Sequence, residues 1–257
     1  MELKPIPGER AAVLGKYLIV CDPHIGFELE LWRQGIKVPF QTAKMAEHIL
    51  TLADSQGISK VILNGDIKHE IAVYRGRQVD ELEKFMAALR EQLDVIFIKG
   101  NHDGGLEGEK LVEIGKHIVT HGHYFPSEEF FGKTWITGHV HPHISFRDDF
   151  GKRASLPVWV FGDVKGTVKT PIVVMPAFNS LRTGLDINTE KKKRGMISRL
   201  DNFSAFLLDG VEVLRVDSVD KSRKSDGLSD MFQFEHGHKK SLNTNTKPAV
   251  LDGTILP

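Results

Sequence analysis

Five short polar clusters constrain the fold of this chain most, because each of them falls just after an apolar run. A polar loop that ends a strand can aim its side chains at a point shared with neighbouring strand ends. Together the clusters supply carboxylates, an amide oxygen and several imidazoles, which suffice as ligands for two divalent metal ions. In chain order they are Asp22-Pro23-His24, Gly65-Asp66, Gly100-Asn101-His102-Asp103, His121-Gly122-His123 and Gly138-His139-Val140-His141.

The apolar runs alternate between strand-like and helical spacing in the first half of the chain. Residues 11–21 predict a hairpin that turns at Gly15-Lys16, and residues 42–56 and 78–93 have the periodicity of amphipathic helices. This alternation predicts a layered α/β domain with a partly parallel sheet. The short strands expected between these segments lie at residues 61–63, 95–98, 118–120 and 134–137.

The second half of the chain has a different character. Strand-like runs at residues 156–161, 170–176 and 203–216 are joined by turns with Gly and Lys, which favours a second, more antiparallel sheet. From about Val219 the sequence is polar and rich in Ser, Lys, Asp and Asn. We therefore expect one domain over residues 1–219 and a weakly ordered C-terminal tail over residues 220–257.

Composition limits the class of protein. The 257 residues are 40% apolar and 26% charged, as in ordinary soluble globular proteins. Cys21 is the single cysteine, which excludes an intramolecular disulfide and fits a reducing compartment. The N-terminal segment MELKPIPGER lacks the apolar stretch of a signal peptide, and no apolar run is long enough to span a membrane. We expect a cytoplasmic protein without a membrane partner.

Charge and histidine content point toward a metal site. Acidic and basic residues balance at 34 each, whereas a nucleic-acid-binding protein is usually more basic. A polyanionic substrate would therefore be bound by a local patch or by a metal. The chain has 12 histidines, and neutral imidazole is the commonest metal ligand in proteins.

The clusters divide into two predicted sets of metal ligands. In an extended segment two residues that are two positions apart point the same way, as expected of Asp22 with His24 and of His139 with His141. A metal pair needs a shared anionic ligand, and Asp66 is the natural bridge. One metal would be bound by Asp22, His24, Asp66 and His141, and the other by Asp66, Asn101, His121 and His139. Such mixed ligation without thiolate suits Mn²⁺, Fe or Zn²⁺.

A metal pair of this kind suggests hydrolysis of a phosphate ester. Two metals about 4 Å apart clamp a phosphate and lower the pKa of a bridging water, so that hydroxide attacks in line. His102 directly follows the Asn101 ligand, and we expect it to face the substrate and to stabilise the transition state or protonate the leaving oxygen. Asp103 is expected to hold the tautomer of His102.

Several nearby residues have two readings from sequence alone. His121 and His123 compete for one ligand position, and we favour His121 because it comes first after the predicted strand. His69 either reaches the site or is a surface histidine, and Arg33 either faces the phosphate or lies on the surface. Lys191-Lys192-Lys193-Arg194 either contacts nucleic-acid phosphates or is a solvated loop.

The order D-x-H, G-D, G-N-H-D, H and G-H-x-H resembles that of the calcineurin-like metallophosphoesterase superfamily over residues 17–185. A finer match resembles its SbcD-related branch, which includes PdeM-type phosphoesterases associated with DNA ligases or Lhr helicases. This finer match lies in Asp22-Pro23-His24-Ile25-Gly26-Phe27-Glu28, Arg33-Gln34-Gly35-Ile36, His69, Met175-Pro176-Ala177-Phe178-Asn179-Ser180 and Gly184.

The resemblance implies a four-layer α/β sandwich of two mixed β-sheets flanked by helices. It also implies a two-metal phosphodiesterase, with Mn²⁺ as the expected metal and Fe, Zn²⁺ or Ni²⁺ as alternatives. A DNA endonuclease is the expected activity, with a helicase or ligase as a candidate partner and a homodimer left open. The same motifs occur in phosphomonoesterases and in cyclic-nucleotide or nucleotide hydrolases, which remain the alternatives. A non-catalytic scaffold is disfavoured because no expected ligand is missing.

Overall fold

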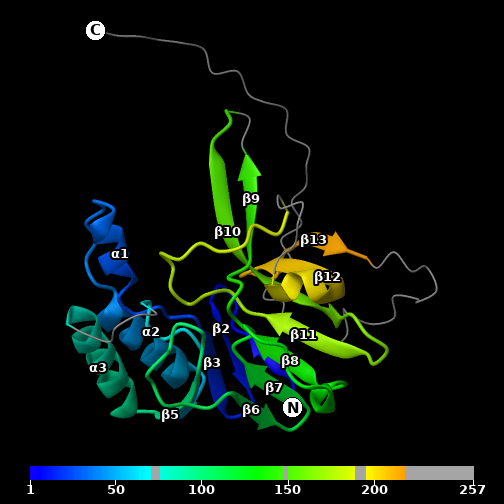
Figure 1. Cartoon of the computed structure of the whole chain (residues 1–257), viewed down its shortest axis with the longest axis horizontal. Coiled ribbons are helices and arrows are strands. Elements are labelled where there is room, and N and C mark those ends of the chain that lie inside the picture. The colour runs from blue at the N-terminus through cyan, green and yellow to red at the C-terminus, as the bar shows by residue number, and fades with distance from the viewer. Residues whose placement is uncertain (71–75, 148–149, 189–194, 218–257) are drawn as a thin grey trace.

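The computed structural model describes residues 1–70, 76–147, 150–188 and 195–217 (Figure 1). The predicted tail at residues 220–257 and the basic run Lys191-Lys192-Lys193-Arg194 lie outside the described residues. No helix within the described ranges is long and apolar enough to cross a membrane.

The first sheet has five strands in the order β1-β2-β3-β4-β5. The predicted hairpin is confirmed, since β2 and β3 pair antiparallel on either side of Gly15-Lys16. β3, β4 and β5 run parallel, with Cys21 opposite Asn64 and Asn64 opposite Ile98, so the loops after these strands leave the sheet at one level. The strands are β1 (Leu3–Pro5), β2 (Ala11–Leu14), β3 (Tyr17–Cys21), β4 (Lys60–Asn64) and β5 (Asp94–Ile98).

Two helices cover the outer face of this sheet. Both were expected from apolar periodicity, and α2 (Thr42–Ser55) and α3 (Arg77–Arg90) bury their apolar faces in one core cluster against β3 and β4. α3 ends before the predicted limit at residue 93 because the chain turns there into β5, although Leu93 still packs in this core. A short helix, α1 (Phe27–Arg33), was not predicted.

The second sheet is larger and mixed. Its strand order is β13-β12-β10-β11-β8-β7-β6, and β9 pairs with the outer half of β10. β7, β8 and β11 are parallel, and the other pairings are antiparallel. The strands are β6 (Leu111–Ile114), β7 (His117–Thr120), β8 (Thr134–Thr137), β9 (His143–Arg147), β10 (Arg153–Val164), β11 (Thr170–Val174), β12 (Leu200–Leu207) and β13 (Glu212–Val216).

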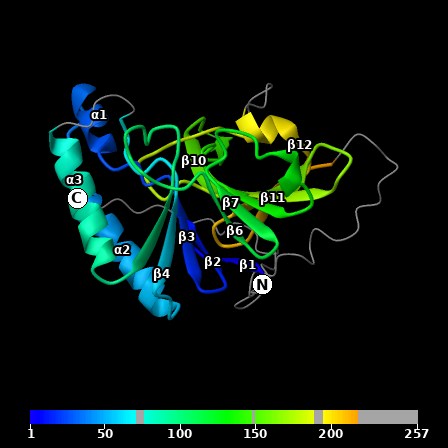
Figure 2. The same cartoon turned by 60° about the horizontal axis from the view of Figure 1, so that its bottom comes forward.

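The two sheets pack face to face around a central apolar core (Figure 2). Cys21 lies fully buried in this core, as expected of a small core residue. The expected sandwich of two mixed sheets is confirmed, with α2 and α3 on the outside of the first sheet. Within the described residues the outer face of the second sheet is covered by loops and the short 3-10 helix Gly195–Arg199, and a third core cluster lies there.

Candidate metal centre

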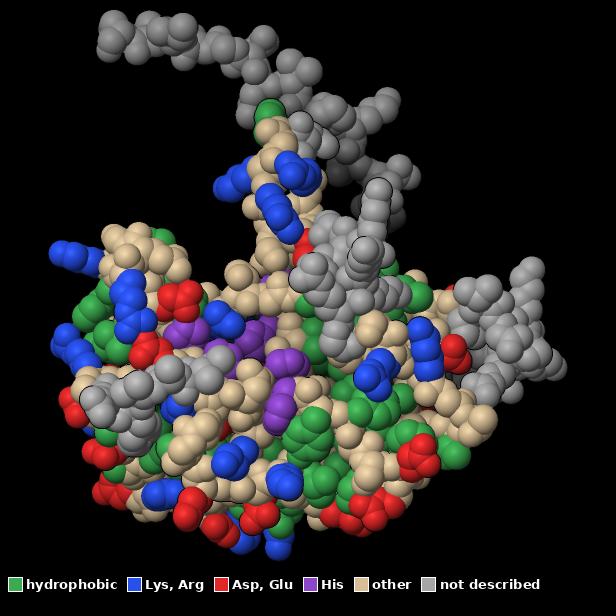
Figure 3. Space-filling model, in the orientation of Figure 1, with side chains coloured by type: hydrophobic (Ala, Val, Ile, Leu, Met, Phe, Trp, Pro, Cys, Tyr) green, Lys and Arg blue, Asp and Glu red, His purple; other side chains and the backbone are tan. Residues whose placement is uncertain are grey.

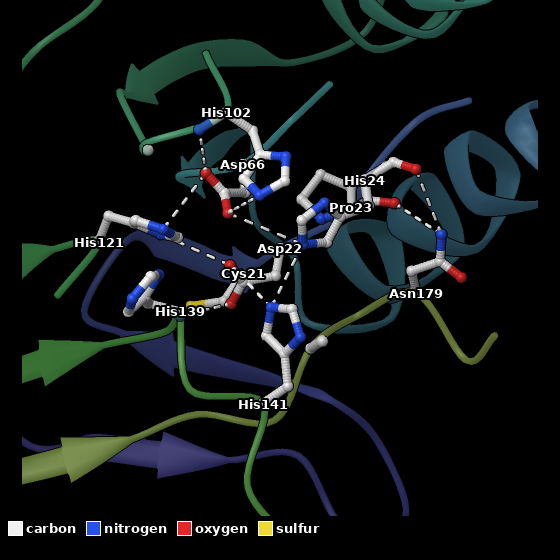
Figure 4. A network of polar contacts seen from close by, with 12 residues as sticks. Cys21, Asp22, Pro23, His24, Asp66, His102, His121, His139, His141 and Asn179 are labelled. Atoms are coloured by element: carbon white, nitrogen blue, oxygen red, sulfur yellow. Dashed lines mark hydrogen bonds and ion pairs between the residues drawn. The ribbon is translucent and has the colours of Figure 1, made fainter. Parts of the chain in front are cut away.

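The polar clusters converge where parallel strands of the two sheets end side by side. Asp22 and His24 follow β3, Asp66 follows β4, and Asn101 follows β5. The second sheet contributes residues after β7 and β8, namely His121, His139 and His141. Figure 4 shows side chains from both sheets pointing toward one another, and Figure 3 shows histidines gathered in a hollow of the surface.

One group consists of Asp22, His24 and His141. Their nearest oxygen and nitrogen atoms lie within 4.8 Å of one another, so the three could hold a metal ion. The Nε2 atom of His141 is 3.3 Å from Oδ1 of Asp22 and 3.3 Å from Nε2 of His24. All three side chains are buried, so their oxygen and nitrogen donor atoms are held close together.

A second group consists of Asp66, His121 and His139, whose ligand atoms also lie within 4.8 Å of one another. The Nε2 atom of His121 is 3.3 Å from Oδ1 of Asp66 and 3.2 Å from Oδ1 of Asn101. The other oxygen of Asp66 lies 3.8 Å from Nε2 of His24, which belongs to the first group. Asp66 therefore stands between the two groups, where the sequence predicted a bridging carboxylate.

The structure places His121 and His123 differently relative to the site. His121 is fully buried and lies against Asp66, whereas His123 is exposed and packs its ring 5.2 Å from that of His121. Only the first histidine after β7 belongs to either group of possible ligands within the described part of the chain.

Two buried polar atoms in the first group have no hydrogen-bond partner. They are Oδ1 of Asp22 and Nδ1 of His24. An unpartnered buried polar atom is costly, and native proteins rarely leave one without a ligand, ion or water. The donor set of carboxylate oxygen and imidazole nitrogen matches what a divalent transition metal requires. The residues present therefore fit such a metal.

The electrostatics keep His24 and His139 in the protonation state that binds a metal. Burial, followed by repulsion from His141, lowers the pKa of His24, and burial with repulsion from His121 lowers the pKa of His139 to about 4. Both imidazoles are therefore neutral at physiological pH, and neutral imidazole is the form that coordinates a metal.

Asp66 and His121 form a coupled pair in the second group. Burial alone would raise the pKa of Asp66, but hydrogen bonding and charge from His121 hold that pKa below its usual value. For His121, burial lowers the pKa, yet the neighbouring Asp22 and Asp66 outweigh burial and raise it. The carboxylates thus stabilise a positive charge at this position, and a bound cation would take the place of the proton.

The backbone at these positions adopts an unusual conformation. Five non-glycine residues of the described chain have positive φ angles: Asp22 (56°), His24 (44°), Asp66 (46°), His139 (66°) and His141 (47°). The left-handed region is strained for residues with a Cβ and typically marks a functional constraint. Every one of these residues belongs to the predicted ligand set.

Two motif glycines explain how the loops approach so closely. A Cβ at Gly100 would collide with the carboxylate and backbone of Asp66, and a Cβ at Gly138 would collide with the carboxylate of Asp22. The backbone N–H of His139 donates to Oδ2 of Asp22 at 2.9 Å. Each glycine thus admits a candidate ligand from a different loop.

His102 lies beside the second group and is partly exposed. Its backbone N–H donates to Oδ1 of Asp66 at 2.9 Å, and its Nε2 lies 3.7 Å from Oδ2 of the same residue. Its Nδ1 donates to the carbonyl of His69. This tautomer leaves Nε2 facing the site.

The expected partnership between Asp103 and His102 is wrong. Oδ1 of Asp103 accepts from the backbone N–H groups of Ile67 and Lys68 at 2.9 and 3.2 Å, and Oδ2 accepts from that of Gly100 at 2.8 Å. Asp103 therefore fixes the loop after β4 against the loop after β5. The tautomer of His102 is held by a backbone carbonyl, which spacing along the sequence could not reveal.

His69 reaches the site and is not a surface histidine. It is buried, its ring centroid is 5.5 Å from that of His24, and its Nε2 contacts Oε2 of Glu30. Together with His24 and His102 it forms a third group whose nitrogens lie within 4.8 Å of one another. Arg33 pairs with Glu70 and is largely exposed, which supports its surface reading.

Two solved structures are similar to this chain. A nuclease from Pseudomonas putida, MPE, has a similar solved structure, with 19% identity, a TM-score of 0.55, and coverage of 82% of this chain and 100% of that chain. YfcE, a phosphoesterase from E. coli, aligns with 15% identity and a TM-score of 0.39 over 78% of this chain and 97% of its own. No protein with a curated description matches the sequence.

The family model described as calcineurin-like phosphoesterase matches residues 15–171. This span covers more than half of the chain and contains the loops after β3, β4, β5, β7 and β8. The chain belongs to the calcineurin-like phosphoesterase family and is a phosphate-ester hydrolase.

Proposed function

We propose that the protein is a two-metal phosphodiesterase that acts on nucleic acid. The observation that supports this most is the position of Asp66 between two groups of possible ligands, one with Asp22, His24 and His141 and the other with His121 and His139. A carboxylate with one oxygen toward each group suits two metals held side by side.

The proposed ligands follow this division. Asp22, His24, Asp66 and His141 would hold one metal, and Asp66, Asn101, His121 and His139 would hold the other. Asn101 joins the second set because its Oδ1 lies beside the Nε2 of His121. The absence of thiolate suits Mn²⁺, which we propose as the physiological metal, with Fe, Zn²⁺ and Ni²⁺ as alternatives.

Metals bound here would supply Lewis-acid polarisation of the phosphate and a nucleophilic hydroxide at neutral pH. The chain itself orients the groups around the phosphate. The backbone N–H of His102 fixes the Asp66 carboxylate, and its Nε2 remains available to the substrate because Nδ1 is engaged with the His69 carbonyl. We assign His102 to stabilising the transition state or protonating the leaving oxygen.

The substrate class follows from the branch of the family that the sequence resembles and from the nuclease among the structural neighbours. A diester of DNA is our first candidate, and a helicase or ligase would be the accompanying protein. Enzymes that hydrolyse phosphomonoesters or cyclic nucleotides have the same metal motifs, so the assay must include both kinds of substrate. The complete set of candidate ligands argues against a non-catalytic scaffold.

The test is hydrolysis of a bis-aryl phosphate, an aryl monophosphate, plasmid DNA and a cyclic nucleotide, each with Mn²⁺ and with a chelator. We expect Mn²⁺-dependent cleavage of the diesters and loss of detectable turnover in Asp66→Ala. His102→Ala should bind metal as the wild type does and turn over about 10²- to 10⁴-fold more slowly. His48→Ala is the matched control, because this side chain lies on the surface and pairs with Glu9.

Two results would contradict the proposal. Faster cleavage of the monoester than of any diester would identify a phosphomonoesterase with the same site. Absence of metal-dependent turnover on all four substrates would revive the scaffold reading. Wild-type activity in His102→Ala would refute the role of that residue while leaving the metal centre intact.

A further inference from the structure

We propose that Arg182 binds a phosphate of the substrate that neighbours the scissile one. This inference rests on the proposed phosphodiesterase function and adds a residue that specifies a polynucleotide over an isolated phosphodiester. Its basis is a loop after β11 that is attached to the candidate metal centre at both ends.

The first attachment is made by Asn179. Its side-chain amide donates to the carbonyls of Pro23 and His24, at 3.0 and 3.4 Å, as Figure 4 shows. Asn179 is fully enclosed, with 1% of its surface exposed. The start of the loop is therefore fixed to the backbone of the segment that carries His24.

The second attachment is made at Gly184 and Leu185. The backbone N–H of Leu185 donates to the carbonyl of Val140 at 3.1 Å, between His139 and His141. A Cβ at Gly184 would collide with the carbonyl and the Cβ of His141, so only glycine permits this approach. The end of the loop is thus packed against the segment after β8.

Arg182 lies between these attachments in a tight turn. The N–H of Leu181 donates to Oδ1 of Asn179 at 2.9 Å, and the N–H of Arg182 donates to the Asn179 carbonyl at 3.2 Å. These bonds fix the backbone of Arg182 relative to Asn179, so its side chain starts from a fixed point of the loop.

The guanidinium lies next to the histidines of the site. It stacks over the ring of Phe27 at 5.1 Å, and Phe27 in turn lies 4.9 Å from the ring of His69. The charge of Arg182 contributes, after burial, to lowering the pKa of His24 and of His69, which agrees with this position. Its place is therefore on the side of the centre that carries His24 and His69.

The guanidinium retains unused hydrogen-bonding capacity. Its Nε is buried and has no hydrogen-bond partner, and no ion pair engages its terminal nitrogens within the described ranges. The nearby Glu30 already contacts His69. A planar guanidinium with free donors matches the oxygens of a phosphate better than any other side chain does.

The position of Arg182 favours a neighbouring phosphate over the scissile one. The scissile group would lie over Asp66, between the two groups of possible ligands, whereas the guanidinium of Arg182 lies over Phe27, whose ring is next to that of His69. A bis-aryl phosphate has a single phosphate and cannot reach both places. An oligonucleotide has a phosphate on each side of the cleaved bond.

The test compares Arg182→Ala and Arg182→Lys with wild type on a short oligonucleotide and on a bis-aryl phosphate. We expect Arg182→Ala to raise the KM for the oligonucleotide about tenfold or more, the loss typical of one charge-assisted contact, with kcat nearly unchanged. The kcat/KM of Arg182→Ala on the bis-aryl phosphate should stay within about twofold of wild type. The KM of Arg182→Lys for the oligonucleotide should lie between those of the wild type and Arg182→Ala. Arg90→Ala, at the end of α3, is the matched control for loss of one arginine.

A second readout does not depend on turnover. Oligonucleotide binding, followed by fluorescence anisotropy with Ca²⁺ in place of Mn²⁺, should weaken by the same factor in Arg182→Ala. The slope of log affinity against log salt should fall by about one, as for the loss of one phosphate contact. Thermal unfolding and bound-metal content should match those of the wild type.

The outcomes separate this inference from the proposed function. Failure of the wild type to hydrolyse the bis-aryl phosphate contradicts the proposed function, and the binding assay then still decides the role of Arg182. Unchanged oligonucleotide KM and affinity in Arg182→Ala would overturn the inference. An equal loss on both substrates, or no oligonucleotide binding by the wild type, would also overturn it.

Discussion

At the scale of single residues, the candidate ligands are distinguished by their backbone as well as by their chemistry. Asp22, His24, Asp66, His139 and His141 all have left-handed φ angles, which are unfavourable for residues with a Cβ. Contacts with neighbouring loops hold them there, such as the bond from the N–H of His139 to Asp22. The fold therefore sustains local strain where the side chains must converge.

This strain predicts an unusual order of stability between two variants of His139. In the metal-free protein we expect His139→Gly to exceed His139→Ala in free energy of unfolding by roughly 0.5–1 kcal/mol, because only glycine adopts φ 66° without strain. Urea unfolding with chelator measures the difference. At His48, inside α2, the same pair should show the opposite order by about 1 kcal/mol, because glycine disfavours a helix. Equal stability of the two His139 variants would mean that this backbone is not strained.

The sequence predicted the residues that meet at the site, but not their partners across loops. The motif residues Asp22, Asp66 and His121 lie together because each comes within two residues of the end of a recognisable strand. The contacts of Asp103 and Glu30 were missed, since they depend on how separate loops pack. Arg182 was also missed, because its motif signal lies in Asn179 and Gly184, which position it.

At the scale of elements, the site is built from strand ends and the glycines that follow them. Gly100 and Gly138 each lie where the carboxylate of another loop occupies the space of a side chain. The motif glycines are therefore part of the packing of the site. Helix α1 was not predicted because it is a single short segment without apolar periodicity. β6 and β9 were not predicted because they are short strands that are defined by their pairing with β7 and β10.

This packing predicts that a single methyl group at Gly138 disrupts the metal centre. Gly138→Ala should displace the Asp22 carboxylate and weaken metal binding at least tenfold, since a displaced ligand loses its bond and its geometry. Metal titration followed by calorimetry measures the affinity. Gly166→Ala is the control, because nothing lies within 4 Å of a Cβ there. Unchanged affinity in Gly138→Ala would show that Asp22 is not a ligand.

At the scale of the whole molecule, the sequence predicted the class of fold but not its balance of layers. The switch from alternating helices and strands to strands alone correctly indicated two sheets. The cover on the second sheet could not be foreseen, because it consists of loops and a 3-10 helix such as Gly195–Arg199, which have no periodic pattern. The packing of the two sheets against one shared core could not be foreseen either, because it depends on contacts between residues far apart in the sequence.

The candidate metal centre has residues from both sheets, so a bound metal should stabilise the whole fold. Mn²⁺ at one hundred times its dissociation constant adds about 2.7 kcal/mol for each site. For a domain of this size that corresponds to a rise in Tm of roughly 5–10 °C for one site. Differential scanning fluorimetry with and without chelator measures the shift. Asp66→Ala should lose most of it, and an equal shift in that variant would place the metal elsewhere.

The division of the candidate ligands between the sheets also bears on how the protein matures. Asp22, His24, Asp66 and Asn101 emerge from one sheet, whereas His121, His139 and His141 emerge from the other. A folding intermediate that has formed only one sheet can assemble neither of the two proposed sets of metal ligands. On the proposed ligand sets, hydrolysis would require the two sheets to be packed together, and a nascent or damaged molecule with separated halves would be inert.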